Sequence, residues 1–140
     1  MKKTLLFAPL FLLLIACSTD KSKFDFKDYK WKAGQAVKLE FSADKPQKVF
    51  LNIRSYYGFP ITEIPLHFEV EDENGQKIEF DKSAFFREEN MDCTGDFCDQ
   101  RFCILKLDTL KSEGDFKLTI SQGLKNITYL GLMDMQVTTE

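Results

Sequence analysis

The sequence predicts an all-β fold, an antiparallel β-sandwich of about seven strands with a jelly-roll or immunoglobulin-like arrangement. Two observations favour it. Apolar and polar residues alternate in several short runs separated by turn residues, which is the pattern of half-buried strands. In addition, no segment carries an apolar repeat of helical period over three turns. A closed barrel is the alternative arrangement, and the alternation alone does not separate the two.

The alternating runs lie at 37–41, 49–53, 66–70 and 116–120, with further strands expected at 78–80, 101–107 and 128–137. The side chains expected inside the sandwich are Val37, Leu39, Phe41, Leu51, Ile53, Leu66, Phe68, Val70, Phe116, Leu118 and Ile120. The Glu73-Asn74-Gly75 segment predicts a hairpin, because Asn-Gly tolerates the positive φ angles of a type I′ turn. Residues 81–100 show no clear periodicity and are expected to be irregular.

The first residues have the composition of an export signal. Two lysines follow Met1, and an apolar run of about a dozen residues, too short to span a bilayer, ends at Ala16-Cys17. Leu14 at −3, a small residue at −1 and a cysteine at +1 resemble the bacterial lipobox. We therefore expect residues 1–16 to be a lipoprotein signal peptide and Cys17 to carry the acyl chains that anchor the protein. Residues 17–30 are mostly polar and are expected to be a tether whose last aromatics begin to touch the domain, which leaves 31–140 for the domain itself.

Composition argues against several functions. The net charge of −3 and the pI of about 5.3 do not favour a nucleic-acid partner. His67, the one histidine, is expected on the outer face of a strand, so zinc hydrolase patterns have no second ligand. No nucleophile elbow, phosphate loop or dinucleotide fingerprint occurs. We expect no catalytic activity, no cofactor and no metal, and we interpret the acidic residues between 69 and 73 as a solvated surface.

Three further cysteines follow in the aperiodic segment and the strand after it. Cys93, Cys98 and Cys103 are separated by four residues each, which matches no Cys-x-x-Cys motif. Export to an oxidising compartment favours a disulfide. Cys93 and Cys98 enclose a plausible turn, so we expect this pair to be bridged, with Cys103 an alternative partner or a buried thiol.

The order of landmarks along the chain resembles the gliding-motility lipoprotein GldH family. Trp31 precedes the alternating strand at 37–41, and a second strand ends in Asn52-Ile53-Arg54. The aromatic-proline pair Phe59-Pro60, a Gly-Asp pair at 95–96, a Gly-x-aromatic strand at 114–122 and a Leu-Gly-Leu motif at 130–132 follow in the family's order. The resemblance covers nearly the whole domain and depends on order and spacing, because each motif is weak by itself.

The resemblance implies a lipid-anchored protein of the outer membrane, expected on its periplasmic face, that belongs to the apparatus for gliding and the linked type IX secretion system. It implies no catalysis, and a role in docking other envelope proteins. The candidate contacts are Arg54, Tyr56, Tyr57 and Phe59, because aromatic and arginine side chains make good interface anchors. The simpler interpretation, which we favour from the sequence, is that these aromatics cap one end of the sandwich. The alternative function is a surface lipoprotein that binds a carbohydrate or peptide ligand through the same tyrosines.

Overall fold

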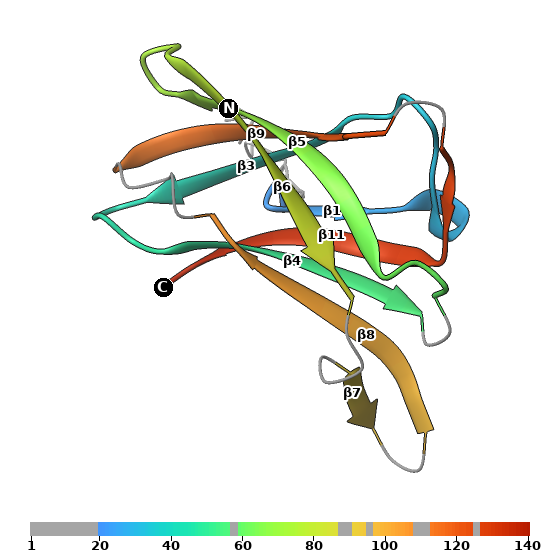
Figure 1. Cartoon of the computed structure of the whole chain (residues 1–140). Coiled ribbons are helices and arrows are strands. Elements are labelled where there is room, and N and C mark those ends of the chain that lie inside the picture. The colour runs from blue at the N-terminus through green and yellow to red at the C-terminus, as the bar shows by residue number, and fades with distance from the viewer. Residues whose placement is uncertain (1–19, 57–58, 87–90, 95–96, 108–112, 125–126) are drawn as a thin grey trace, which may run out of the picture.

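The computed structural model describes residues 20–56, 59–86, 91–94, 97–107, 113–124 and 127–140, with only the backbone described for 91–102. These residues form antiparallel sheets that pack face to face, as predicted (Figure 1). The strands are β1 (Lys23–Asp25), β2 (Lys30–Trp31), β3 (Val37–Ala43), β4 (Val49–Tyr56), β5 (Glu63–Asp72), β6 (Lys77–Phe85), β7 (Met91–Thr94), β8 (Phe97–Lys106), β9 (Gly114–Gln122), β10 (Tyr129–Leu130) and β11 (Leu132–Thr139). One 3₁₀ turn, η1 (Lys27–Tyr29), joins β1 to β2.

Two large sheets form the layers of the sandwich. One has the strand order β1-β11-β4-β8-β7 and the other has the order β3-β9-β5-β6, while β10 and β2 form a separate ribbon. Each large sheet keeps its own edge strands, which distinguishes the sandwich from the closed barrel that the sequence left open. More strands are present than the seven expected, because short segments at the N-terminus and around the cysteines also pair.

The core lies between the two large sheets and follows the predicted alternation. Of the eleven side chains expected inside, ten are buried, and Phe41 is half-buried where it stacks on Phe116 with ring centroids 5.2 Å apart. Lys38 and Glu40, the polar partners of that alternation, are exposed. Trp31 is fully buried as well, and its indole Nε1–H donates to the carbonyl oxygen of Gln35 at 2.8 Å.

The N-terminal segment is more closely bound to the domain than the expected boundary at Trp31 implies. β1 pairs with β11, with Phe24 opposite Met135. Phe26 is buried against the Trp31 ring, with ring centroids 5.7 Å apart, and its N–H donates to the carbonyl of Met133 at 2.9 Å. The folded part therefore includes residues from Lys23 onward that were assigned to the tether.

Residues 81–100 also differ from the expectation of an irregular segment. β6 continues to Phe85, and β7 and β8 pair within this range. The sequence does not predict the second half of β6, because Lys82 stands where an apolar residue would continue the alternation of Ile78 and Phe80. Its amino group donates to the carbonyl oxygen of Lys106 across the edge of the sandwich, which accommodates the charge at this position.

The hairpin between β5 and β6 is present, but its turn is not the type I′ turn that was predicted. A type I′ turn needs positive φ at both central residues, whereas only Gly75, with φ 77°, adopts it here. The loop spans residues 73–76, and the Asp72 carboxylate accepts hydrogen bonds from the N–H groups of Asn74 and Gln76, both at 2.9 Å. This side-chain cap replaces the second positive-φ residue.

Within the described residues, no helix has the length and apolar character needed to cross a bilayer.

Candidate docking site

Two exposed tyrosines meet at the end of the sandwich where β4 finishes. Tyr29 ends η1 and Tyr56 ends β4, and their rings pack edge to face with centroids 4.7 Å apart. Tyr29 is 46% exposed and Tyr56 36% exposed, so the pair is not part of the core. Leu130, which pairs with Lys30 through the β10–β2 ribbon, is 59% exposed at the same end. Tyr29, Tyr56 and Leu130 together are called the tyrosine end below.

The backbone that presents Tyr29 is strained. Asp28 and Tyr29 both have φ of 54°, a conformation that non-glycine residues rarely adopt and that costs roughly 1 to 3 kcal/mol per residue. Two hydrogen bonds hold it: the N–H of Tyr29 donates to the carbonyl of Phe26 at 3.1 Å, and the carbonyl of Tyr29 accepts from Gly131 at 2.8 Å. The surrounding structure therefore maintains a conformation that the local sequence does not favour.

Gly131 links the two tyrosines through its own backbone. Its N–H donates to the carbonyl of Tyr29, and its carbonyl accepts from the N–H of Tyr56 at 2.9 Å. Its φ of 100° lies outside the range of ordinary L-residues, and a Cβ placed there would lie 3.3 Å from Cδ2 of Phe59. Glycine is thus required at this position both by the backbone angle and by the neighbouring ring.

The hydroxyl groups of the two tyrosines also interact. A side-chain hydrogen bond that the Tyr56 hydroxyl donates to Tyr29, with smaller contributions from burial and from the charge of Tyr29, raises the pKa of Tyr56 above its ordinary value. A raised tyrosine pKa means that the neutral hydroxyl is favoured in the fold, so this interaction is complete at neutral pH and is lost as the pH rises through that pKa. The Tyr56 hydroxyl is therefore neutral at neutral pH, and both tyrosine side chains are accessible to solvent.

Positively charged side chains are exposed in the segment that carries Tyr29. Lys27, Lys30 and Lys32 are all exposed in the segment that carries Tyr29, with Asp28 the one acidic residue among them. The strand β11, eight residues long, leads from this end of the molecule to the other, a distance of about 25 Å.

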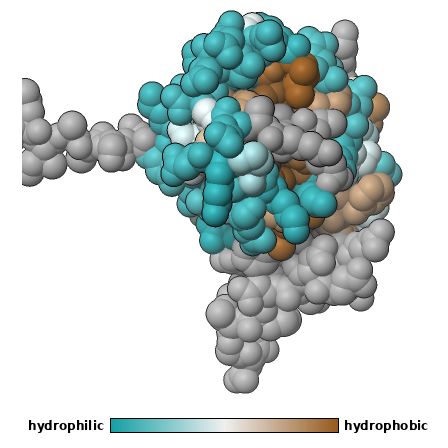
Figure 2. All heavy atoms as spheres, turned by 90° about the vertical axis from the view of Figure 1, so that its left-hand side faces the viewer, coloured by the Kyte–Doolittle hydropathy of each residue, from teal (hydrophilic) through white to brown (hydrophobic). Residues whose placement is uncertain are grey.

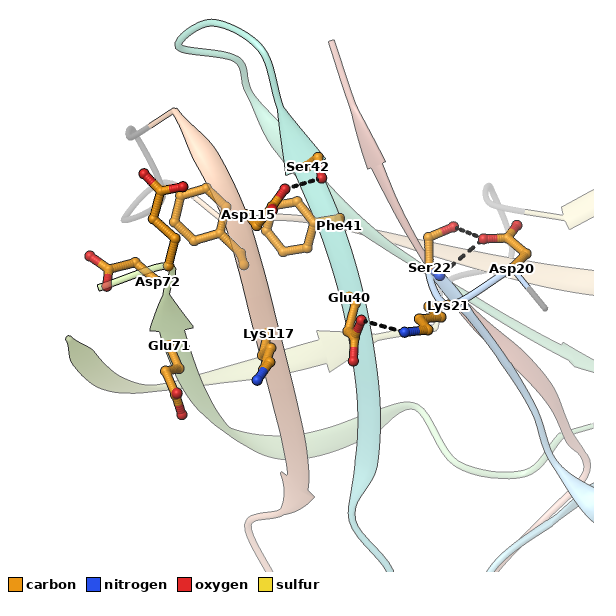
Figure 3. A pocket seen from close by; sticks show the side chains of 12 residues that line it. Asp20, Lys21, Ser22, Glu40, Phe41, Ser42, Glu71, Asp72, Asp115 and Lys117 are labelled. Atoms are coloured by element: carbon orange, nitrogen blue, oxygen red, sulfur yellow. Dashed lines mark hydrogen bonds and ion pairs between the residues drawn. The ribbon is translucent and has the colours of Figure 1, made fainter. Parts of the chain in front are cut away.

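The opposite end of the sandwich is acidic. A hollow of about 530 Å³ is lined by residues of β3, β5 and β9 and by the chain entering β1 (Figure 3). Its lining residues are Asp20, Lys21, Ser22, Glu40, Phe41, Ser42, Glu71, Asp72, Glu73, Asp115, Phe116 and Lys117. Lys21 pairs with Glu40 at 3.2 Å, and the hydroxyl of Ser42 donates to the carboxylate of Asp115. Viewed from this end, apolar side chains appear between hydrophilic ones (Figure 2).

The four residues predicted as partner contacts occupy different environments. Arg54 lies half-buried on the outer face of the five-stranded sheet, where its guanidinium binds the buried carboxylate of Asp134. Tyr56 is exposed, as described above. Phe59 is buried against Phe86, with ring centroids 5.1 Å apart, so it cannot form the exposed contact proposed for it. Its ring instead packs against Gly131, the residue whose backbone is hydrogen-bonded to both Tyr29 and Tyr56.

Four of the other predicted residues lie wholly or partly outside what the structure describes. Cys17 and Tyr57 are not among the described residues, and Cys93 and Cys98 have only their backbones described, in β7 and β8. The expected lipidation and the Cys93–Cys98 bridge remain predictions. Cys103 is a buried free thiol. Burial raises the pKa of this thiol, and a hydrogen bond from the backbone N–H of Phe85 partly offsets the increase.

His67 lies on the outer face of the four-stranded sheet, as expected. Its Nδ1 is 2.7 Å from Oδ1 of Asp81, and its Nε2 is 3.9 Å from Oε2 of Glu79. Among the described residues, no group of three His, Cys, Asp or Glu side chains is placed to hold a metal ion.

The residues that sequence reasoning missed at the tyrosine end are Tyr29, Leu130 and Gly131. Tyr29 was assigned to the tether because it falls in a Lys- and Asp-rich segment. The Leu130-Gly131-Leu132 motif could have indicated this site. An isolated glycine within a strand indicates a bulge or a close approach of another backbone segment. The contact of that glycine with both tyrosines was not predictable, because it depends on pairing between segments about 75 to 100 residues apart.

Comparison with known proteins adds little to this geometry. No family model matches the chain, and no curated protein matches it. Among solved structures, TmCBM61 in complex with β-1,4-galactotriose is 12% identical with a TM-score of 0.34, and the alignment covers 84% of this chain and 69% of that one. BtGH115A, a family GH115 4-O-methyl-α-glucuronidase with specificity for decorated arabinogalactans, is 16% identical with a TM-score of 0.35, over 75% of this chain and 14% of that one. At these TM-scores neither alignment assigns a function or ligand to this chain.

Proposed function

We propose that the protein is a lipid-anchored, non-catalytic docking module of the bacterial envelope and that it binds a protein partner through the tyrosine end. The resemblance to the GldH family supports a place among the accessory components of gliding motility and type IX secretion. The proposal joins three elements: acyl chains on Cys17, a rigid β-sandwich, and an exposed aromatic surface.

The single observation that carries the docking role is the exposed tyrosine pair, in which Tyr29 lies on strained backbone. Strain of this kind persists only where the surrounding structure maintains it, and it concentrates at functional sites. Burial does not account for it here, since both rings remain in solvent. Tyrosine is among the residues that dominate binding energy at protein interfaces.

Charge specifies the chemistry of the partner. The exposed Lys27, Lys30 and Lys32 favour a partner surface that carries carboxylates around an apolar contact, because complementary charges raise association rates and exclude wrong partners. The acidic hollow at the opposite end disfavours the same partner there. The tyrosine end is thus the site for an acidic segment of another envelope protein.

The anchor would orient this surface. Cys17 precedes the first described residue by three positions, a span of at most about 10 Å. Asp20 and Lys21 line the acidic hollow, so acylation of Cys17 would hold that end beside the membrane. The tyrosine end would then face away from the bilayer, toward partners in the periplasm.

A carbohydrate ligand is the second candidate, and the same two tyrosines favour it, because an exposed aromatic ring combines an apolar body with a polar hydroxyl. It differs from the first candidate in one respect that can be measured. A neutral oligosaccharide would bind independently of the three lysines, whereas an acidic protein partner would not.

Site-specific photo-crosslinking in intact cells tests the proposal. A photoreactive phenylalanine analogue is placed at Tyr29 or at Leu130, and at Lys38 as a control on the outer face of the other sheet. We expect one discrete protein adduct from the first two positions, lost when Tyr56→Ala or Lys30→Glu is added, and none from Lys38. Equal adducts from all three positions would contradict a specific site. Binding of a neutral oligosaccharide that Tyr56→Ala abolishes and Lys30→Glu leaves unchanged would support the second candidate instead.

A further inference from the structure

The strand β6 forms an edge of the four-stranded sheet and pairs only with β5 (Figure 1). Two backbone hydrogen bonds define which of its residues face that partner: Phe86 N–H to Thr62 at 2.9 Å, and Asp72 N–H to Gln76 at 3.0 Å. Alternate positions of an antiparallel pair exchange both bonds. The even-numbered residues of β6 therefore bond to β5, and the odd-numbered residues direct N–H and C=O groups to the open side.

The open stretch runs from 77 to 83. In the part of the chain that the structure describes, no backbone hydrogen bond reaches the outward groups of Lys77, Glu79, Asp81 and Ser83. Beyond it the edge is occupied, since the backbone of Phe85 bonds to the thiol of Cys103. Four consecutive outward positions are enough to seat a short additional strand.

The inner side of this edge is apolar and incompletely covered at Ile78 and Phe80, while the next inward residue, Lys82, is bound to the carbonyl of Lys106. Ile78 is 45% exposed although it faces inward opposite Val70. Phe80 is half-buried and stacks on Phe68, with ring centroids 4.9 Å apart and ring planes 10° from parallel. An added strand with apolar residues on its inner face would cover both side chains.

The outer side of the edge is acidic. The charge of Lys77 is compensated by Glu69 at 3.0 Å and Glu71 at 3.7 Å. The side chains of Glu79 and Asp81 are 61% and 82% exposed, with His67 as their neighbour on the next strand. An incoming strand would meet two carboxylates, so basic residues on its outer face are favoured.

A second copy of this chain does not suit the edge. The antiparallel register that overlaps residues 77–83 most fully places Glu79 opposite Asp81 at two positions, with no lysine opposite either carboxylate. Like charges directly opposite one another destabilise a strand pair. The same carboxylates that disfavour self-pairing would attract a basic strand.

We propose that the β6 edge binds an extended segment of another protein as a fifth strand, and that this segment alternates apolar residues with lysine or arginine. Main-chain hydrogen bonds to residues 77–83 supply affinity, and the alternation matches Ile78 and Phe80 on one face and Glu79 and Asp81 on the other. This second surface is separate from the tyrosine end and does not depend on it.

Fluorescence anisotropy with purified full-length protein and a labelled nine-residue peptide of alternating valine and lysine tests the proposal. The informative variant is Glu79→Pro, which removes one outward N–H without removing a bond to β5, and proline is tolerated on edge strands. Its matched control is Glu79→Ala, which removes the charge and keeps the N–H. We expect Glu79→Pro to weaken binding at least tenfold and Glu79→Ala only two- to threefold, with Tyr56→Ala unchanged.

A peptide with methylated backbone nitrogens at alternate positions provides a second measurement that requires no variant of the protein. We expect one of its two methylation patterns to lose binding to the wild-type chain and the other to retain it. The proposal would be overturned if Glu79→Pro and Glu79→Ala bound the peptide equally well and the wild-type chain still bound both methylated peptides. That result would indicate charge attraction alone. Failure of the alternating peptide to bind the wild-type protein would overturn it too, and neither result bears on the tyrosine end.

Discussion

Gly131 has a role at the residue scale that its lack of a side chain makes possible. Its two backbone groups bond to Tyr29 and Tyr56, so the position of each tyrosine depends on the other through one residue. An alanine would be strained at φ 100° and would also bring its Cβ to within 3.3 Å of Phe59. The exposed tyrosine pair is thus connected directly to the buried core.

We predict that Gly131→Ala lowers the free energy of unfolding by about 2 kcal/mol or more, from backbone strain together with displacement of Phe59. Urea unfolding measures it. Gly34→Ala is the matched control, because Gly34 also has positive φ, at 75°, but nothing lies within 4 Å of its added Cβ. It is expected to cost about 1 kcal/mol. Equal losses for the two variants would contradict a specific contact between Gly131 and Phe59.

At the scale of elements, β1 determines where the domain begins. It is three residues long, but Phe26 directly after it is buried among Phe24 and Trp31. Replacing a buried phenylalanine by alanine removes apolar contact and leaves a cavity. The stability of the sandwich therefore depends on residues that resemble a polar linker in composition.

We predict that Phe26→Ala lowers the free energy of unfolding by about 3 kcal/mol. Lys27→Ala, the exposed next residue, is the control and is expected to change it by less than about 0.5 kcal/mol. Thermal or urea denaturation of both variants gives the comparison. If Phe26→Ala were as stable as the wild type, the segment before Trp31 would be a tether after all.

The alternation in sequence predicted the elements that have one solvated and one buried face. β3, β4, β5 and β9 are of this kind, and Phe41 is the one predicted core residue that is only half-buried. The approach identified the first half of β6 but failed for its second half, for β7 and for the beginning of β8. Lys82 breaks the alternation of β6 and is accommodated only because Lys106 of β8 lies across the edge. β1 was missed because three residues are too few to establish a period.

The site was less predictable than the fold, because it too depends on contacts between segments far apart in the sequence. Tyr56 and Phe59 were chosen for the same reason, as aromatic side chains that suit an interface, but Tyr56 is exposed whereas Phe59 is buried in the core. Burial of an aromatic residue in a loop depends on what packs over it, here Phe86 and Gly131. Only the folded chain brings those residues together.

At the scale of the whole molecule, charge is distributed unevenly between the two ends. The acidic hollow lies where the chain enters β1, and the lysines surround Tyr29 at the other end. Anchoring at Cys17 would convert this asymmetry into a fixed orientation at the membrane surface.

We predict that Cys17→Ser moves the protein from the membrane fraction to the soluble fraction or leaves the precursor unprocessed, because serine has no thiol to alkylate. Detergent phase partitioning of cell extracts measures it. Ser18→Ala keeps the thiol and serves as the control, with partitioning unchanged. Cys17→Ser protein that still enters the detergent phase at the mature size would contradict the lipoprotein prediction.

The direction of β1 has a mechanical consequence. The chain runs from Asp20 through β1 directly into η1, so Tyr29 is joined to the N-terminal side by a short covalent path along one face of the sandwich. A pull on the chain before Asp20, opposed by a load at Tyr29, is transmitted along this path rather than through the core. Because both load points lie on the same continuous segment, the hydrogen bonds between β1 and β11 flank the loaded path and do not have to break for it to carry force. Tension between anchor and partner would therefore tighten a single strand and leave the packing of the two sheets unloaded.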